Sequence, residues 1–323
     1  METPVASPIR FFQPGQFSRG AVAAGAAALL LSASACGGGD GGGGGGQGGA
    51  TPDVQPDEEL AALVPQEVRD AGTLTVGTDS SYAPAEFLDT DGKTIIGFDV
   101  ELFDAVAAKL DLDVAWESAT FGTIVEGVDS GKYDVGISSF TINEERLEQV
   151  NMVSYYNVGT QWFTAKGDPA GVDPENACGK TIAVQANTVQ VPDIEARSEQ
   201  CEEDGEPAIQ IDQYEGQDEA TQSIVSGKSD AGLADMPVAF YAIEQTGDKL
   251  EALGEQYEAA PYGAVVHSDS DELAEAIQAG YQSIIDDGTY EQILDGWGLA
   301  DQGLIEESEV NPDIAAEDED GEA

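Results

Sequence analysis

One arginine stands out among the residues that could do chemistry. Arg146 belongs to a chain with 12 lysines and arginines against 63 aspartates and glutamates. A guanidinium can grip a carboxylate through two parallel hydrogen bonds. Hydroxyl side chains that could share such an anion come just before it, at Ser138, Ser139 and Thr141. Two interpretations are open: a residue that binds a carboxylate, or a cation that only offsets repulsion among its glutamate neighbours.

Two aspartates could supply the opposite charge. Asp79 follows the apolar segment 74–78, and Asp235 follows 230–234. If both segments are parallel strands, the aspartates lie outside the carboxyl ends of a sheet, where ligands of α/β proteins bind. Each could meet a cationic group, and each could equally cap the helix that follows. A zwitterion removed from water needs both charges paired, because an unpaired buried charge is expensive.

Alternating strands and helices would position these residues. In the first part of the chain we expect strands at 74–78, 113–116 and 133–138 and helices at 99–110 and 123–128. Asp99 is expected to cap the first of these helices, and Asn143 to cap the short helix that carries Arg146. A smaller unit follows, with strands at 181–184, 209–214 and 230–234 and helices at 189–198, 218–226 and 237–245. A strand at 262–266 and helices at 271–286 and 290–297 complete the folded body. Such repeated units predict an α/β fold with parallel sheets covered on both faces.

The formal net charge of −51 excludes some partners. So acidic a surface repels nucleic acid and anionic lipid headgroups. It also costs stability unless salt screens it, so a salt-rich habitat and a generally acidic secreted protein both fit. The only histidine, His267, is expected to be a surface residue. No metal site is expected, because the spacing of the cysteines does not resemble one and a single histidine could not complete it.

The first 35 residues have the pattern of a signal peptide. Arg10 and Arg19 precede an apolar run at 21–31 that is too short for a permanent membrane span, and small residues lead to Cys36. This order resembles a bacterial lipoprotein signal, in which the cysteine carries the lipid. Ordinary cleavage after Ala35 without lipid is the alternative. No later segment reaches about 18 unbroken apolar residues.

The remaining cysteines, Cys178 and Cys201, form an even pair in an oxidising compartment, so a disulfide is predicted, with two free buried thiols as the alternative. Residues 36–70 begin with a glycine run and continue rich in Pro, Asp and Glu, which predicts a flexible tether. Residues 306–323 are acidic and lack aromatic residues, which predicts a disordered tail.

Several motifs occur in a recognisable order between about 73 and 300. They are Gly-Phe-Asp-Val-Glu-Leu at 97–102, Ser-Gly-Lys-Tyr-Asp at 130–134, Thr141 followed by Glu145-Arg146, and Gly-Thr-Tyr at 288–290 with Trp297 beyond. The chain resembles the extracellular solute-binding proteins, family 3, of polar amino-acid ABC importers. The resemblance implies a two-lobed periplasmic-binding-protein-like fold (type II), with two parallel or mixed sheets joined by a two-strand hinge. It places the hinge crossings near 155–159 and 258–263, the discontinuous first lobe at 71–160 plus 259–305, and the second lobe at 161–258.

The same resemblance implies roles for individual residues. Arg146 would bind the α-carboxylate of a ligand, helped by Thr141, by the backbone near Ser139 and by Thr188 at a helix start. Asp235 would receive the α-ammonium, and Asp79 an ammonium or side-chain donors. The ligand would be flanked by Tyr82 and Phe121, and its side chain would reach Gln185.

The residues themselves leave alternatives open. Tyr82 and Phe121 could be ordinary core, and Thr188 could be a helix cap. Ala85 stands where the family often has a large aromatic residue, and Val189 replaces a hydroxyl residue.

The function implied is a monomeric, non-enzymatic receptor for a polar L-amino acid, such as glutamine or a basic amino acid. It would need no cofactor, would be held to the outer face of the membrane by lipid, and would pass its ligand to the permease of an ABC importer. An alternative is an extracellular enzyme on the same fold, similar to cyclohexadienyl or prephenate dehydratases. A sensor domain is a third reading, but it would need a following membrane span and signalling domain, which the sequence does not show.

Overall fold

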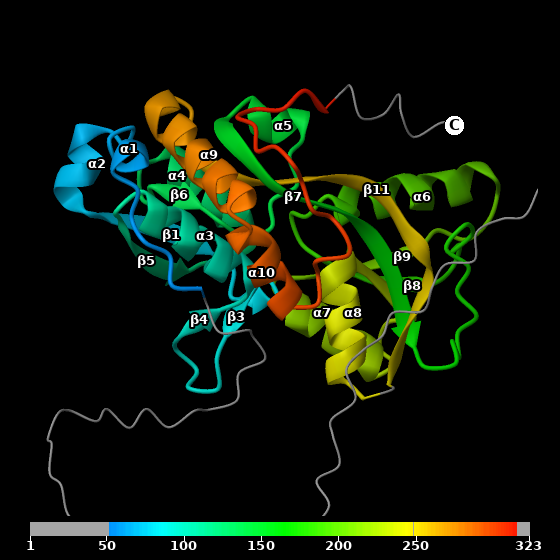
Figure 1. The fold of residues 1–323 in the computed structure, drawn as a ribbon. Helices are drawn as coiled ribbons and strands as arrows, with labels where there is room; N and C mark the ends of the chain where they lie inside the picture. Colours follow the sequence, from blue (N-terminus) through cyan, green and yellow to red (C-terminus); the bar gives the residue numbers. More distant parts are fainter. Residues whose placement is uncertain (1–51, 248, 315–323) are drawn as a thin grey trace, which may run out of the picture. The chain divides into compact units, whose positions relative to one another are not determined.

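The computed structural model describes residues 52–247 and 249–314. Its strands form one eight-stranded mixed sheet with the order β5-β1-β6-β11-β7-β10-β8-β9, and a three-stranded antiparallel sheet with the order β2-β3-β4 (Figure 1). The predicted α/β class is confirmed. The two sheets that were expected are joined into one, because the long strands at the centre hydrogen-bond to the strands of both halves.

The first half contains the parallel strands β1, β5 and β6. The strands and helices of this half are β1 (Thr73–Thr78), β5 (Asp113–Ser118), β6 (Val135–Gly136), α3 (Phe98–Lys109), the 3-10 turn η1 (Phe121–Thr123), α4 (Ile124–Asp129) and α5 (Glu144–Leu147). The small sheet consists of β2 (Ser81–Tyr82), β3 (Glu86–Leu88) and β4 (Ile95–Ile96), where no strand was predicted.

The second half repeats the alternation. It consists of β8 (Thr181–Gln185), α6 (Gln190–Glu203), β9 (Gln210–Tyr214), α7 (Gln217–Val225), β10 (Ala231–Asp235) and α8 (Met236–Gln245). Strand β8 runs parallel to both β9 and β10. Each of these elements lies within about two residues of the predicted one, except that α6 continues about a turn and a half further.

Two long strands connect the halves. Strand β7 (Val150–Ala165) pairs antiparallel with β11 (Leu250–His267) over most of their lengths, and Figure 1 shows them running side by side. Strand β11 also pairs with β6 of the first half, and β7 with β10 of the second. The pairing of β7 with β11 is irregular near Tyr257, Ala260 and Tyr262, within the segment where crossings were expected. Such irregularities bend strands, which suits a hinge.

The chain returns to the first half with α9 (Asp271–Asp286) and α10 (Thr289–Gly296), close to the predicted helices. Helices α3 and α9 pack together through apolar faces that include Val106, Leu110 and Gly280. A side chain at Gly280 would meet Val106 at 2.8 Å, so this helix crossing needs a residue without Cβ.

The start of helix α3 differs from the prediction. Gly97, not Asp99, is the N-cap residue, and no side chain caps the helix. A Cβ on Gly97 would lie 2.0 Å from the carbonyl oxygen of Ala85, and its φ of 143° belongs to glycine. Asp99 is a buried residue of the first turn, and it accepts hydrogen bonds from Ser139 and Tyr155. By contrast, Asn143 caps the helix of Arg146 as predicted, accepting from the backbone N–H of Arg146 at 2.9 Å.

The tether prediction is wrong for the residues just before β1. Helices α1 (Glu58–Ala61) and α2 (Gln66–Ala71) occupy them, Asp57 caps α1, and Val64 is buried. Leu60 and Val68 also pack against the core, but so few apolar residues in an acidic segment were too weak a signal to detect. The signal peptide at 1–35, Cys36 and the glycine run lie outside the described residues.

The tail prediction is wrong for residues 306–314. Ser308 donates to the carbonyl of Ser154 at 2.7 Å, and the backbone N–H of Asn311 donates to the carbonyl of Met152 at 2.7 Å. The segment lies along β7 and satisfies its outer backbone groups, which composition does not reveal. Residues 315–323 lie outside the described part.

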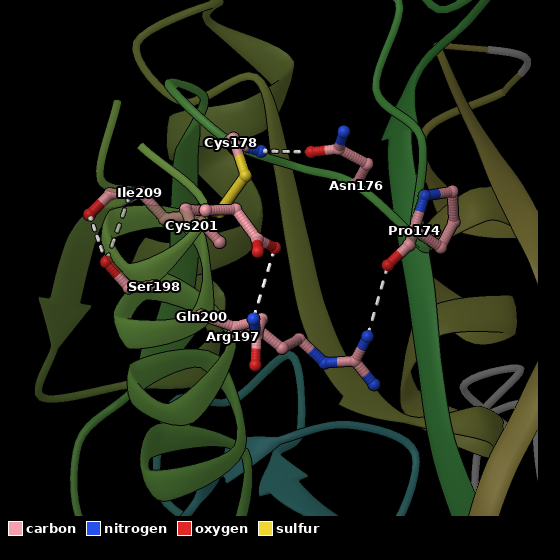
Figure 2. The surroundings of a disulfide bond; sticks show 9 residues. Pro174, Asn176, Cys178, Arg197, Ser198, Gln200, Cys201 and Ile209 are labelled. Atoms are coloured by element: carbon pink, nitrogen blue, oxygen red, sulfur yellow. Dashed lines mark hydrogen bonds between the residues drawn. A yellow bond between two sulfur atoms is a disulfide. The ribbon is translucent and has the colours of Figure 1, made fainter. Parts of the chain in front are cut away.

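The disulfide prediction is confirmed: Cys178 and Cys201 are bonded, with 5.6 Å between their Cα atoms. The bond ties the loop before β8 to helix α6, and Figure 2 shows Arg197 of the same helix donating to the carbonyl of Pro174. Within the described ranges, no helix has the length and apolar character of a membrane span. Those ranges also contain no cluster of three or more His, Cys, Asp or Glu placed to hold a metal ion.

Removing the disulfide should destabilise the second half. We expect the double variant Cys178→Ser, Cys201→Ser to lose about 3 kcal/mol of unfolding free energy, because the bond closes a loop of 23 residues in the unfolded chain. Urea unfolding measures the change. Reductant should lower the midpoint of the wild-type protein to that of the variant and leave the variant unchanged. Equal midpoints in all four samples would contradict the assignment.

Candidate functional site

A small enclosed cavity collects residues that follow the carboxyl ends of β1, β6, β8 and β10. Its lining is Tyr82, Phe121, Ser138, Ser139, Thr141, Arg146, Thr188, Val189, Gln190 and Asp235. The structure therefore brings together all the predicted site residues except Asp79 and Gln185. The space left inside is about 10 Å³, enough for about one water molecule.

Arg146 reaches the cavity from α5. Its Nη1 donates to the carbonyl oxygen of Thr141 at 2.6 Å, and its guanidinium lies 5.5 and 5.3 Å from the ring centroids of Phe121 and Phe140. Among the described residues, no carboxylate lies within ion-pair distance of it. Burial lowers the pKa of Arg146 to about 10, against the opposing effect of Asp235 and Glu145. The group stays cationic at neutral pH and keeps N–H donors available for an anion.

Asp235 lies on the other side of the cavity, at the end of β10. Its Oδ2 accepts hydrogen bonds from Tyr82 Oη at 2.9 Å and Tyr262 Oη at 2.6 Å, and its Oδ1 accepts from Gln190 Nε2 at 2.8 Å. Asp235 occupies the N-cap position of α8, but its side chain makes no capping bond there. The alternative that Asp235 caps the helix through its side chain is therefore wrong. Burial raises the pKa of Asp235, and the three hydrogen bonds and the charge of Arg146 oppose that rise.

The Asp235 carboxylate thus joins elements from the whole molecule. Tyr82 belongs to the small sheet of the first half, Gln190 begins α6 of the second half, and Tyr262 lies on β11 between them. Tyr262 lies at an irregularity of the β7–β11 pairing, so Asp235 is bonded directly to that irregular part of β11.

Asp79 and Gln185 lie outside this lining and bond to each other across the two halves. Gln185 Nε2 donates to Asp79 Oδ2 at 2.7 Å, and the same oxygen accepts from the backbone N–H of Phe121 at 3.2 Å. Burial raises the pKa of Asp79 above its ordinary value, although the hydrogen bonds that it accepts oppose the rise. The amide oxygen of Gln185 is buried without a hydrogen-bond partner. These two side chains therefore offer acceptors close to the Phe121 wall of the cavity.

The remaining predicted residues have mixed roles. Tyr82 and Phe121 are buried, as core residues would be, and they also line the cavity. Thr188 donates its hydroxyl to the carbonyl of Gln185 at 2.8 Å, and its side chain makes no bond to the helix after it, so that side chain is not a cap. Ser139 has a left-handed backbone, with φ of 49°, where the chain turns into the cavity.

Two site residues were missed by sequence reasoning. Gln190 is a polar residue at a helix start after a strand, a signal that was present in the sequence. Tyr262 lies in an apolar run that predicts only a buried strand, so its hydroxyl gave no signal. Each donates to Asp235, and both are almost completely buried.

A larger cleft of about 760 Å³ adjoins the cavity and shares Phe121, Arg146, Thr188 and Val189 with it. Carboxylates on its rim come from both halves, at Glu126, Glu145 and Glu195. This rim gives the approach to the cavity a negative potential, which favours cationic over anionic solutes.

Residues 74–300 match the family model of bacterial extracellular solute-binding proteins, family 3. The chain belongs to this family. The fold is that of its type II periplasmic-binding-protein-like members, so the predicted family and fold class are confirmed.

The proteins to which this chain is similar match it over most of their own length. The arginine-binding protein ArgT of Corynebacterium glutamicum is 38% identical over 257 residues, which cover 79% of this chain and 84% of ArgT. A solved structure described as an ancestral arginine-binding protein bound to arginine is 31% identical, with a TM-score of 0.65, covering 70% of this chain and 98% of that one. An ancestral amino-acid-binding protein described as a precursor of cyclohexadienyl dehydratase is 28% identical, with a TM-score of 0.63, covering 73% and 99%.

The bond between Tyr262 and Asp235 should stabilise the folded protein. We expect Tyr262→Phe to lower the unfolding free energy by about 1–3 kcal/mol, because it leaves a buried carboxylate with one donor fewer. Tyr156→Phe is the matched control. It lies on the neighbouring strand, and its buried hydroxyl has no hydrogen-bond partner, so its removal should cost close to nothing. Urea unfolding of both variants compares them, and equal losses would contradict this reading.

Proposed function

We propose that the protein captures an L-amino acid between its two halves and delivers it to an ABC importer, without catalysing a reaction. The observation that carries this proposal is the pairing of unlike charges around one cavity. Arg146 and Asp235 both line it, come from different halves, and form no ion pair with each other. A zwitterion placed between them would pair both of its charges.

The α-carboxylate of the ligand would lie against Arg146. Thr141, Ser139 and Thr188 line the same part of the cavity and would add hydrogen bonds. Thr188 precedes the start of α6, where backbone N–H groups and the helix dipole favour an anion. Because Arg146 has donors to spare, it can bind the carboxylate without breaking its bond to Thr141.

The α-ammonium would lie against Asp235, which Tyr82, Gln190 and Tyr262 hold in place. An amino acid is larger than the cavity, so the halves must part for it to enter. The direct bonds between Tyr82 and Asp235 and between Gln185 and Asp79 must then open. Ligand binding and closure therefore involve the same groups.

The side chain of the ligand is proposed to be basic. Asp79 and the unpartnered amide oxygen of Gln185 offer acceptors, and the cleft rim is acidic. Tyr82 and Phe121 supply aromatic faces on which a guanidinium can stack. The names of the similar proteins, which include arginine-binding proteins, support L-arginine as the first candidate.

The proposal includes a place in the cell. The family is one of extracellular proteins, and we propose that residues 1–35 direct export and that Cys36 carries a lipid anchor. We also propose that the protein acts as a monomer, and that its lobes divide at the β7 and β11 crossings. Labelling with a radioactive fatty acid, lost on Cys36→Ser, would test the anchor.

An enzyme on the same fold is the second candidate, since one similar structure is described as a precursor of a dehydratase. The site offers it no obvious general acid, because Asp235 is held by three donors and Arg146 is a cation. Conversion of prephenate by the purified protein, abolished by Asp235→Asn, would favour the enzyme and overturn the receptor proposal.

Removing either member of the charge pair should abolish tight binding. Calorimetry of ligand-free protein with L-arginine should give a dissociation constant in the low micromolar range or tighter, about −8 kcal/mol or beyond. Arg146→Ala or Asp235→Asn should weaken it by about 3–5 kcal/mol, two to three decades or more, because a buried charge loses its partner.

Two matched controls accompany this test. Arg197→Ala removes an arginine that pairs with Asp193 outside the cavity, and it should bind L-arginine normally. Agmatine, which lacks the carboxylate, should bind weakly to the wild-type protein and no more weakly to Arg146→Ala. An equal loss with both ligands would show that Arg146 does not meet the carboxylate.

Asp79 should set the preference for a charged side chain. The wild-type protein should prefer L-arginine over its neutral analogue L-citrulline, and Asp79→Asn should reduce that preference by about tenfold or more, mostly by weakening arginine. Competition calorimetry with the two ligands measures the ratio. Glu145→Gln, on the exposed rim, is the control and should leave the ratio nearly unchanged because water screens that charge. A ratio unaffected by Asp79→Asn would remove Asp79 from the ligand contacts.

A further inference from the structure

Two fully buried carboxyl groups lie behind the wall of the cavity. Glu86 belongs to β3 and Asp99 to the first turn of α3, and neither is exposed to solvent. On the cavity side of them are Ser138 and Ser139, which line the binding space. Nothing in the proposed function uses these two acids.

Each acid holds one of the two serines. Glu86 Oε1 accepts from the hydroxyl of Ser138 at 2.7 Å. Asp99 Oδ2 accepts from the backbone N–H of Ser139 at 2.8 Å, from its hydroxyl at 3.0 Å and from Tyr155 Oη at 2.7 Å. The bonds from Ser139 hold it in its left-handed conformation, which is costly for a residue other than glycine.

Each carboxyl group has a second oxygen that its serine does not occupy. Glu86 Oε2 and Asp99 Oδ1 are buried and receive no hydrogen bond from an N–H group or a hydroxyl. The two side chains lie within hydrogen-bond reach of one another. A carboxyl–carboxylate bond leaves neither oxygen unsatisfied, whereas two carboxylates in contact would repel each other.

The surroundings offer no positive charge to compensate two anions. The titratable groups that act on the pair are Asp79 after β1, Tyr82 of β2, Tyr155 and Tyr156 of β7, Tyr262 of β11 and Tyr281 of α9. None is a cation, and no salt bridge among the described residues includes either acid. Burial raises the pKa of Glu86 well above its ordinary range and that of Asp99 to about 6.

We propose that Glu86 and Asp99 share one proton in the folded protein at neutral pH, and that this pair positions the Ser138–Ser139 wall of the binding cavity. The proton makes Glu86 the donor that Asp99 lacks, so one negative charge is buried instead of two. The bonds continue on both sides of the pair. The backbone N–H of Asp79 donates to Ser138 Oγ at 3.0 Å, and Tyr155 links Asp99 to the hinge strand β7.

The pair should make stability depend on pH in a defined direction. A folded-state pKa above the unfolded value means that the folded protein binds more protons, so stability falls as pH rises through that interval. We expect the unfolding midpoint of ligand-free wild-type protein to fall from about pH 4.5 upward until the raised pKa of Glu86 is passed. Glu86→Gln should lose this contribution, because its amide donates to Asp99 at every pH while its oxygen still accepts from Ser138.

A double-substitution cycle separates a shared proton from simple packing. Glu86→Gln keeps one donor between the two side chains, and so does Asp99→Asn, whose amide can turn to Glu86. The double variant places two amide N–H₂ groups face to face with no acceptor between them. The double variant should lower the folding equilibrium constant about tenfold more than the product of the two single fold-changes. Additive losses would overturn the shared proton.

Infrared spectroscopy tests the proton directly and does not depend on a variant that folds. Wild-type protein at neutral pH should show the carbonyl band of a buried protonated carboxyl group, which fades as pH rises and is absent from Glu86→Gln. A spectrum without that band at neutral pH would overturn the proposal. Both readouts use ligand-free protein, so they stand or fall separately from amino-acid binding.

The positioning role rests on the proposed function and has its own measurement. The affinity of wild-type protein for L-arginine should weaken at alkaline pH below the titration of Arg146, and Glu86→Gln should weaken less over the same interval. If the infrared band shows the shared proton but the affinity for L-arginine has the same pH profile in both proteins, the pair has only a structural role. That result would overturn its role in positioning the cavity.

Discussion

The scarcity of positive charge constrains the whole molecule. Arg146 is held by one carbonyl and two aromatic rings, without a carboxylate in ion-pair distance among the described residues. Asp235 faces the same cavity and receives only neutral hydrogen-bond donors. Arg146 therefore stays cationic at neutral pH, and neither side chain forms an ion pair with its surroundings. A molecule that carries both signs is the natural complement of this arrangement, because it alone pairs the two without forcing them together.

The elements around the cavity make that pairing a property of the whole fold. Asp235 is bonded to a strand of the small sheet, to the first residue of α6 and to the hinge strand β11. Behind the opposite wall, Asp99 is bonded through Tyr155 to the other hinge strand, β7. Both walls are thus bonded to the two long strands that connect the halves. The buried hydroxyl groups of Tyr155 and Tyr262 make these bonds between the cavity walls and the long strands.

Much of this could be predicted from sequence, for identifiable reasons. The strand-end rule located Asp79, Ser139 and Asp235, and the rarity of cations singled out Arg146, so the residues lining the cavity were mostly found in advance. The missing residues carried their information in tertiary contacts. Tyr262 is indistinguishable from a core tyrosine until its hydroxyl is seen on Asp235, and Asp99 was read as a cap because local spacing cannot show Ser139 packing onto it. The ordered segments at 57–71 and 306–314 were missed because composition reports average polarity, whereas a few apolar side chains packed on the core and some bonds to β7 hold these segments in place.

The order of strands in the large sheet has a consequence for how the polypeptide is made. Strand β6 pairs with β11, whose residues are synthesised more than a hundred positions later, and β7 is completed by backbone contacts from residues 308–311. Strand β6 of the first half therefore lacks its partner β11 until most of the chain has left the ribosome. Contacts so distant in sequence form slowly, so the core of the nascent chain is completed late. A topology of this kind delays compaction until nearly the whole chain has been synthesised.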